Sequence, residues 1–451
     1  MAAGWRRYQH VPALFGDGVF YLPEPNRYLR ELATGEWRSD PAEPKHGPIR
    51  KPTPQTLKNC AQYLSNFLRW CTEYRDDNGN LVPLDWRQIE YTTHIVDGYQ
   101  QDMLEGRWGL SELRPGTVNL RGDEATRFLE WAAWRGLRRP FPVAKVIKQS
   151  SAKSGRHSHG HRATPIVVRA GRRRASPEDL LLPTREATDA WLIDVQRRYG
   201  ATKALMCELI IRTGIRISEC LFWRADTLPA NKSEWRIVDG GSYVQVLIRA
   251  GNKGGNKQLD EEGELTRHPT GRRIHLPIAL AEKLKDYADT TRLIARARYV
   301  RAENVPMAER NRRAREKLPL RLFLGDFLGV PFTAQTLRNV WKCPSRPMDE
   351  WSPHLGRHYY ACYFLLVRIE EQAAMLKNLD RKTAMLVASS PAFVDNYWQA
   401  LQQQLGHIDK ETTERYTTWL RQVTSNFALT LLNKKPTAVE TFEGPSAGTT
   451  A

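Results

Sequence analysis

The sequence predicts a mainly helical α+β protein with a small antiparallel β-sheet, divided between two domains. Three observations support this fold class. The chain has 451 residues, more than one ordinary hydrophobic core accommodates. Apolar residues recur at spacings of three and four over 57–71, which is typical of one face of a helix. Apolar and polar residues alternate over 243–248, which is typical of a half-buried strand.

The first part of the chain predicts an N-terminal arm followed by a helical domain. Residues 1–50 contain many Pro and Gly and little periodicity, so we expect an arm there. Residues 51–144 predict an all-helical domain, with a break at the DDNGN stretch (76–80) and Gly136 as a stop signal. The apolar faces of its helices are expected to comprise Leu57, Cys60, Leu64, Phe67, Leu68 and Cys71, and then Ala125, Phe128, Leu129 and Ala132.

A basic segment separates this domain from the next. Over 145–175 the sequence has nine Lys or Arg and no acid, which predicts an extended interdomain linker over 145–179. Such a linker can lie along a phosphate backbone or simply be solvated. His157, His159 and His161 have no Cys or carboxylate nearby, so we expect no metal site there.

The second domain is predicted over 180–432. Two helices are expected over 181–214, and three short strands at WRIVDG, YVQVLIRAG and RRIHLP. The remainder is mostly helical and includes an Arg-rich insertion at 296–319. Residues 433–451 are predicted to form a flexible C-terminal tail.

Composition narrows the class of partner. Lys plus Arg number 68 against 50 Asp plus Glu, which makes the net charge +18 and indicates a nucleic-acid partner. Basicity that serves solubility or binding to anionic lipid is the alternative. None of the six cysteines forms a CxxC pair, and neither a signal peptide nor an apolar run of about 18–20 residues is present. We therefore expect a cytoplasmic protein with reduced cysteines and no membrane partner.

Four short clusters in the second domain carry residues suited to phosphoryl chemistry. They are RTGIRISECLFW, the turn AGNKGGNKQ, SPHLGRHYYACYFL and LGHIDKETTERY. Taken singly, each is equally typical of an ordinary joint, turn or helix start. Together they supply two arginines, whose guanidinium forks match phosphate oxygens, and a tyrosine able to act as a covalent nucleophile. We see no carboxylate cluster of the two-metal kind, so side chains must supply the positive charge.

These clusters, in this order, resemble the tyrosine recombinases, the integrase family of site-specific DNA recombinases. The resemblance covers about 180–430 strongly, and the helical region 50–140 resembles the family's core-binding domain more weakly. By resemblance to the family's motifs, the site residues are Arg216 and Glu219 in TGIRISE, Lys253 or alternatively Lys257 in GNKGGNK, His354 and Arg357 in PHLGRH, and His407 and Tyr416 in LGHIDKETTERY.

The resemblance implies a mechanism that needs no metal, ATP or other cofactor. Tyr416 would attack a DNA phosphate, forming a 3′-phosphotyrosyl link and freeing a 5′-hydroxyl. Arg216 and Arg357 would bind the non-bridging oxygens, with His407 hydrogen-bonded on the other side, while Lys253 protonates the leaving oxygen. His354 would help with the tyrosine proton, and Glu219 would orient the groups that contact the phosphate.

The resemblance also implies an assembly on DNA. The two domains would close as a C-shaped clamp on double-stranded DNA with specific recombination sites, and four copies would form a homotetramer, associated with the nucleoid when bound. The apolar residues Phe427, Leu429, Leu431 and Leu432 would pack on a neighbouring copy or on their own domain.

Departures from the family pattern leave some points open. The lysine turn has an extra residue, an acidic insert follows it at 258–270, and the interval from Arg357 to Gly406 is long. The inserts favour an enzyme of a mobile genetic element, but integration, excision, transposition and resolution all remain open, as do accessory proteins. The alternatives are a type IB topoisomerase, a catalytically silent DNA-binding protein of the same fold, and an RNA-binding protein. No aromatic RNP strand in the sequence supports the last of these.

Overall fold

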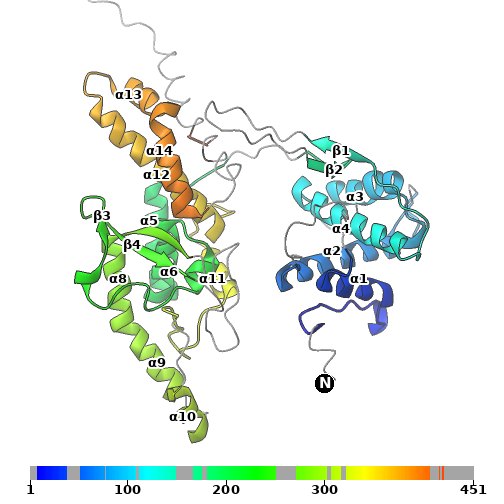
Figure 1. Cartoon of the computed structure of the whole chain (residues 1–451), viewed down its shortest axis with the longest axis horizontal. Helices are drawn as coiled ribbons and strands as arrows, with labels where there is room; N and C mark the ends of the chain where they lie inside the picture. The colour runs from blue at the N-terminus through cyan, green and yellow to red at the C-terminus, as the bar shows by residue number, and fades with distance from the viewer. Residues whose placement is uncertain are drawn as a thin grey trace, which may run out of the picture. The chain divides into compact units, whose positions relative to one another are not determined.

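The computed structural model confirms a mainly helical α+β fold with small antiparallel sheets (Figure 1). It describes residues 8–37, 51–76, 78–107, 111–148, 166–174, 180–249, 271–301, 306–315, 321–406, 416 and 419–420. The chain divides into two compact units, Met1–Glu178 and Asp179–Ala451. Each unit has its own core and is described separately below.

The first unit is a helical domain with an aromatic core. Its helices are α1 (Pro23–Thr34), α2 (Pro54–Glu73), α3 (Gln100–Glu105), α4 (Pro115–Trp134), a π-helix (Tyr91–Tyr99) and short 3₁₀ turns at Asp17–Val19 and Trp86–Gln88. The expected apolar faces of α2 and α4 are buried, except that Leu68 is only partly buried. Trp70, Trp131, Tyr28 and Phe128 are fully enclosed. The Tyr28 ring meets Phe128 and Trp131 edge to face, and Phe128 stacks on Trp131.

The expectation of an N-terminal arm over 1–50 is wrong for its described part. Helix α1 packs in the core of the first unit, with Tyr28 and Leu29 fully buried. Pro23 stands in the first turn of this helix, where a missing backbone N–H costs nothing. Pro content therefore marks a helix start here, and the Tyr28 hydroxyl donates a 2.7 Å hydrogen bond to Glu124 on α4.

The expectation of an extended linker over 145–179 is also wrong where the structure describes it. Strands β1 (Lys145–Lys148) and β2 (Ile166–Arg169) form an antiparallel pair. Arg169 is buried and makes a 2.6 Å ion pair with Asp123 on α4, while the Tyr91 hydroxyl donates to the carbonyl of Ala170. The basic side chain is thus paired inside the first unit, which composition alone does not reveal. His157, His159 and His161 lie outside the described residues.

The second unit surrounds a three-stranded antiparallel sheet with helices (Figure 1). The strands β3 (Ile237–Val238), β4 (Tyr243–Ile248) and β5 (Arg272–Pro277) lie where the sequence predicted them. On β4, Val244, Val246 and Ile248 face the core, as their alternation predicted. The helices are α5 (Arg185–Tyr199), α6 (Ala201–Thr213), α7 (Ile217–Leu221), α8 (Ile278–Asp289), α9 (Thr291–Arg301), α10 (Met307–Arg315), α11 (Ala334–Trp341), α12 (Pro353–Met375), α13 (Arg381–Ala388) and α14 (Pro391–Leu405), with a 3₁₀ turn at Lys232–Glu234.

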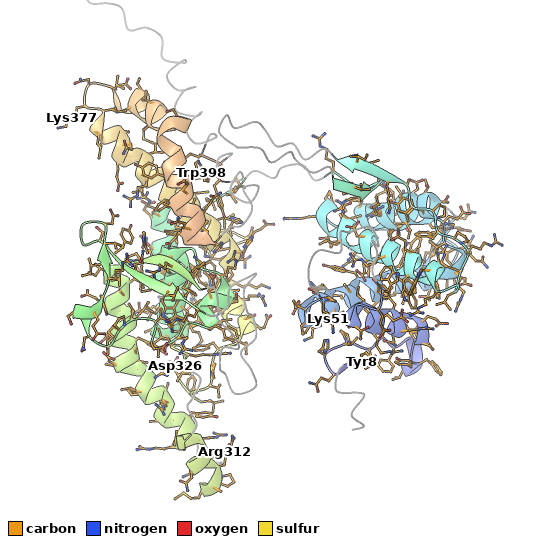
Figure 2. All side chains as sticks on the ribbon, in the orientation of Figure 1. Tyr8, Lys51, Arg312, Asp326, Lys377 and Trp398 are labelled. Carbon is orange, nitrogen blue, oxygen red and sulfur yellow. The ribbon has the colours of Figure 1, made fainter. Side chains whose placement is uncertain are left out.

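The Arg-rich insertion predicted at 296–319 contributes to α9 and α10. Helix α9 follows α8 away from the sheet, and Arg312 lies on α10 at the far end of this extension (Figures 1 and 2). The side chains of α10 that the structure describes are exposed or half-buried; Arg313 stacks over the Tyr299 ring at 4.6 Å and pairs with Glu309. The extension is therefore held by polar and cation–π contacts rather than by an apolar core.

A cluster of tryptophans supports the start of α12. The rings of Trp191, Trp341 and Trp351 lie within 5.7 Å of one another, centre to centre. Gly356 allows α12 to approach this cluster, because a Cβ there would lie 2.3 Å from Trp341. The same turns of α12 carry the predicted His354 and Arg357, so packing against the tryptophan cluster fixes where both residues lie in the second unit.

The six cysteines are all free and buried, as expected from the sequence. Burial raises the pKa of the Cys60 thiol to about 12. Across the part of the chain that the structure describes, the helices are all too short or too polar to cross a membrane.

Candidate active site

The site is built around the buried carboxylate of Glu219. Helix α6 ends at Gly214, which has φ +65° and would place a Cβ 2.4 Å from Tyr360 if it were any other residue. The chain then enters α7, where Arg216 is the N-cap. The backbone N–H of Arg216 donates to Glu219 Oε2 at 2.7 Å, as in a capping box. Glu219 is thereby fully enclosed.

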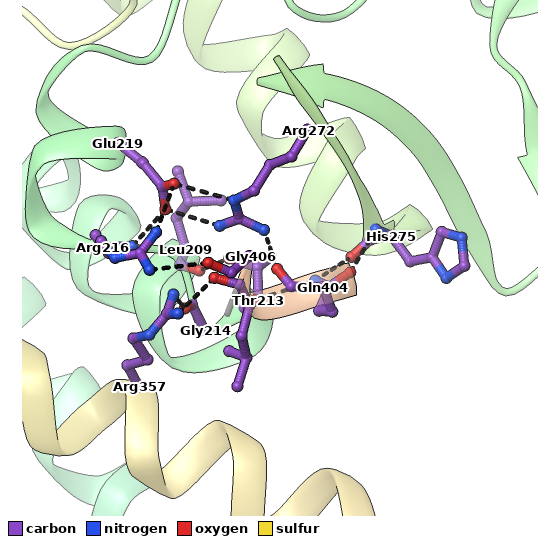
Figure 3. A network of polar contacts seen from close by, with 11 residues as sticks. Leu209, Thr213, Gly214, Arg216, Glu219, Arg272, His275, Arg357, Gln404 and Gly406 are labelled. Atoms are coloured by element: carbon purple, nitrogen blue, oxygen red, sulfur yellow. Dashed lines mark hydrogen bonds and ion pairs between the residues drawn. The ribbon is translucent and has the colours of Figure 1, made fainter. Parts of the chain in front are cut away.

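Arg272, the first residue of β5, is the principal ion-pair partner of Glu219. Its Nε lies 3.0 Å from Oε1 and its Nη2 lies 2.7 Å from Oε2 (Figure 3). Burial by itself would raise the pKa of Glu219, but the hydrogen bonds and charge of Arg272, together with Arg216, lower it. The carboxylate is therefore ionised at neutral pH. Its hydrogen bonds hold Arg216, at the start of α7, and Arg272, on β5, in place.

The guanidinium groups of Arg216 and Arg357 both reach the end of α14. Arg216 Nη2 donates to the carbonyl of Gly406 at 3.1 Å, and Arg357 donates to the carbonyls of Leu405 and Gly214 (Figure 3). Arg357 is 3% exposed. Burial and the charge of Arg216 lower its pKa to about 9, and the nearby Glu219 only partly opposes this.

Among the described residues, this arrangement leaves positive charge without a matching carboxylate. Three guanidinium groups, from Arg216, Arg272 and Arg357, surround one carboxylate, and no other described carboxylate forms an ion pair with any of them. A buried cation whose pKa is lowered by other cations is stabilised when an anion binds. The site can therefore accept an anionic group such as a phosphate, with Arg216 and Arg357 as its donors.

Gln404 secures the last turn of α14 to the sheet and to α6. Its side-chain oxygen accepts from the His275 N–H at 2.8 Å, and its amide donates to the carbonyls of Thr213 and His275 at 3.0 and 3.1 Å. Arg272 also donates to the Gln404 carbonyl. The segment immediately before His407 is thus bonded to α6, β5 and α12.

The hydroxyl of Tyr416 lies beside a pair of histidines. It is 3.0 Å from His358 Nδ1, and His358 Nε2 is 3.1 Å from His354 Nε2. Tyr416 and His358 are buried, whereas His354 is exposed. Arg357 and His358 are consecutive on α12, so the phenol lies beside the turn of α12 that carries one of the arginines.

The structure brings together five of the residues predicted from the sequence. Arg216, Glu219 and Arg357 share one network, and His354 and Tyr416 are linked through His358. Lys253, Lys257 and His407 lie outside the described residues. No group of three His, Cys, Asp or Glu suitable for a metal ion occurs among the described residues.

Sequence reasoning missed three members of the site: His358, Arg272 and Gln404. His358 had a detectable signal, because it follows Arg357 directly and lies one helical turn after His354. Arg272 and Gln404 had none, since their partners lie 53 and 129 residues away along the chain.

Comparison with known proteins gave similarities among solved structures only. No protein-family model matches the chain, and no curated protein does. The chain is similar to the XerH site-specific recombinase bound to palindromic difH substrate in a post-cleavage complex, with 14% identity, a TM-score of 0.45, and coverage of 84% of this chain and 80% of that one.

Two further structures show similarities of the same order. One is a lambda integrase dimer bound to a COC′ core site, with 13% identity, a TM-score of 0.41 and coverage of 92% and 81%. Another is the integrase of the Tn1549 transposon in complex with circular intermediate DNA, with 15% identity, a TM-score of 0.41 and coverage of 86% and 94%. By name, all three are recombinases or integrases.

Proposed function

We propose that this protein is a site-specific DNA recombinase that cleaves and rejoins strands through a covalent 3′-phosphotyrosyl intermediate. One observation carries the proposal: two arginines with uncompensated charge lie beside a tyrosine whose hydroxyl is hydrogen-bonded to a histidine. A structural tyrosine needs no such neighbours, whereas attack on a phosphodiester needs both.

In the proposed reaction, Tyr416 Oη forms a bond to the phosphorus and the bond from phosphorus to the 5′-oxygen breaks. Arg216 and Arg357 exchange their carbonyl partners for non-bridging phosphate oxygens and stabilise the charge that develops there. Glu219 keeps Arg216 and Arg272 in place without contacting DNA. The 5′-hydroxyl of a second strand then attacks the phosphotyrosine and restores the tyrosine.

Residues outside the described part complete the proposal. Lys253, with Lys257 as the alternative, protonates the leaving 5′-oxygen, and His407 hydrogen-bonds the phosphate. Neither a metal ion nor ATP takes part, because the phosphotyrosine conserves the energy of the phosphodiester. The net charge of +18 supports binding to duplex DNA, where basic residues replace condensed counterions.

The assembly and biological role are proposed on the same basis. Exchange between two sites requires four active tyrosines, so we propose a homotetramer on DNA, inside the cell and associated with the nucleoid. The long inserts favour the recombinase of a mobile genetic element, with accessory proteins as further partners.

Covalent trapping tests the proposal. The protein is mixed with nicked suicide duplexes from the DNA flanking its gene, in EDTA and without ATP, and analysed for a protein–DNA species that survives SDS. Wild type should form it and Tyr416→Phe should not. Tyr363→Phe is a matched control and should form it, since the Tyr363 hydroxyl donates to Pro183 instead.

The outcomes separate the competing functions. A covalent species that persists in Tyr416→Phe would show that another tyrosine is the nucleophile. Salt-sensitive binding without any covalent species would favour a silent DNA-binding protein. Relaxation of supercoiled plasmid that lacks paired sites would favour a topoisomerase.

A further inference from the structure

His358 stands between the tyrosine and solvent. Its Nδ1 lies 3.0 Å from the Tyr416 hydroxyl and its Nε2 lies 3.1 Å from His354 Nε2, so one imidazole bridges two partners through opposite nitrogens. His358 is 5% exposed, Tyr416 is fully buried and His354 is exposed. The three groups therefore form an unbroken hydrogen-bonded path from a buried phenol to water.

The Tyr416 hydroxyl is hydrogen-bonded to His358, and His354 is hydrogen-bonded to the opposite nitrogen of that ring. The bridging ring of His358 occupies the position next to the hydroxyl, and the two histidine ring centres are 4.4 Å apart. His354 and His358 lie four residues apart on α12, which places them on the same helical face. A neutral phenol is a weak nucleophile, so attack by Tyr416 requires a base that accepts the proton of its hydroxyl.

We propose that His358 is a catalytic residue that accepts the Tyr416 proton and passes one on to His354. The inference rests on the proposed function. It requires the tautomer of His358 with Nδ1 unprotonated and Nε2 protonated. As the bond from Tyr416 Oη to phosphorus forms, the phenol proton moves to Nδ1, and the Nε2 proton moves to His354 Nε2. The bond from phosphorus to the 5′-oxygen breaks, and that oxygen takes a proton from the ammonium assigned to Lys253.

The relay also places the resulting charge favourably. After cleavage, the positive charge rests on exposed His354 rather than beside buried Arg357, which already carries a cation next to Arg216. The titratable groups hydrogen-bonded to His358 include Tyr416 and His354, and Arg357 precedes His358 directly in the chain. In rejoining, His358 returns the proton to the tyrosine, so the same path serves both directions.

The test measures single-turnover cleavage of the suicide duplex by the full chain as a function of pH. His358→Gln should slow cleavage by about 10²–10⁴-fold near neutral pH, the range typical of a positioned acid–base group. The deficit should shrink as pH rises, because hydroxide then removes the phenol proton. His354→Gln should slow cleavage less. His10→Gln is the matched control and should leave the rate unchanged, since His10 is exposed in the first unit and is not part of the site.

A fluorinated tyrosine at position 416 distinguishes proton transfer from a structural role. Its more acidic phenol should restore part of the rate of His358→Gln, which a merely misplaced tyrosine would not gain. If His358→Gln fails to fold, the same tyrosine analogue in the otherwise natural chain should shift the pH profile of cleavage to lower pH.

Two results would overturn the relay. One is a His358→Gln protein that cleaves as fast as wild type or faster, which would mean that the hydrogen bond from His358 to Tyr416 does not promote cleavage or holds the tyrosine in an inactive state. The other is a deficit that neither pH nor the fluorinated tyrosine changes. In both cases wild type still forms the covalent species, whereas failure of the proposed function itself would leave wild type without it.

Discussion

Replacement of Glu219 by Gln should destabilise the second unit strongly although Glu219 does not contact DNA in our proposal. The carboxylate is fully enclosed and accepts four hydrogen bonds, two from Arg272 and two from Arg216. Glutamine has the same shape, but the NH₂ of its amide replaces one carboxylate oxygen. A donor then faces the N–H groups of the arginines in place of an acceptor. The substitution therefore removes the only described negative charge among three guanidinium groups.

The expected magnitude follows from the burial of the partners. Removal of one member of a buried ion pair costs about 3–5 kcal/mol. The side chains of Arg272 and Arg216 retain 14% and 23% exposure, so water can partly solvate them. We therefore expect a loss of about 3 kcal/mol in the free energy of unfolding of the second unit. The Arg357 pKa should also fall further, because Glu219 now opposes its decrease.

Urea denaturation followed by tryptophan fluorescence measures this loss. Trp191, Trp341 and Trp351 lie in the core of the second unit and Trp70 and Trp131 in that of the first, so the emission reports both units. The transition that Glu219→Gln shifts should be that of the second unit alone. A double-mutant cycle with Arg272→Met is the control, since removal of both charges should cost less than the sum of the two single changes by at least about 1 kcal/mol. A loss below about 1 kcal/mol, or additive effects in the cycle, would refute the assignment of Glu219 as the electrostatic centre of the site.

Three further predictions concern the same site. Arg357→Met should abolish covalent trapping yet change the urea midpoint little. The fall of the Arg357 pKa from 12.5 to about 9 means that the folded protein disfavours the charged guanidinium by about 5 kcal/mol. Methionine removes this cost, which offsets the loss of two hydrogen bonds to carbonyls, worth about 1–3 kcal/mol each. Gly356→Ala should lower the melting temperature, because its Cβ would lie 2.3 Å from Trp341, and an unchanged value in calorimetry would contradict this packing. Because the folded pKa of Glu219 is lowered, its contribution to stability should be complete above its ordinary value of 4.5 and be lost as pH falls through the lower folded value; a denaturation series from pH 6 to pH 3 should show a smaller acid-dependent loss in Glu219→Gln.

The helices and strands followed from local patterns. The periodic apolar residues of α2 and α4 and the alternation of Val244, Val246 and Ile248 could be predicted because each pattern spans one element. Helix α1 could not, because Pro23 marks both an irregular segment and the first turn of a helix. The buried pairing of Arg169 with Asp123 is non-local, so composition predicted a solvated linker instead.

The residues of the site also differ in how far they could be predicted from the sequence. Arg216 and Glu219 lie in one short motif, and His354 and Arg357 in another, so their resemblance to the motifs of tyrosine recombinases identified them. Arg272 and Gln404 join the site through contacts between distant segments, and no spacing in the sequence encodes such contacts. His358 was identifiable in principle, but its role depends on the tertiary position of Tyr416.

The end of α14 is held largely through its backbone carbonyls, and this has an evolutionary consequence. Arg216, Arg272 and Arg357 donate to the carbonyls of residues 404–406, which every amino acid carries. The bonds themselves tolerate any side chain at these positions, so other contacts decide which residues fit there. Gly406 has φ +61°, and a Cβ at this position would lie 2.7 Å from Arg272, so we expect glycine to be retained there across homologues. In the Glu219–Arg272 pair each side chain needs the other, so we expect positions 219 and 272 to change together.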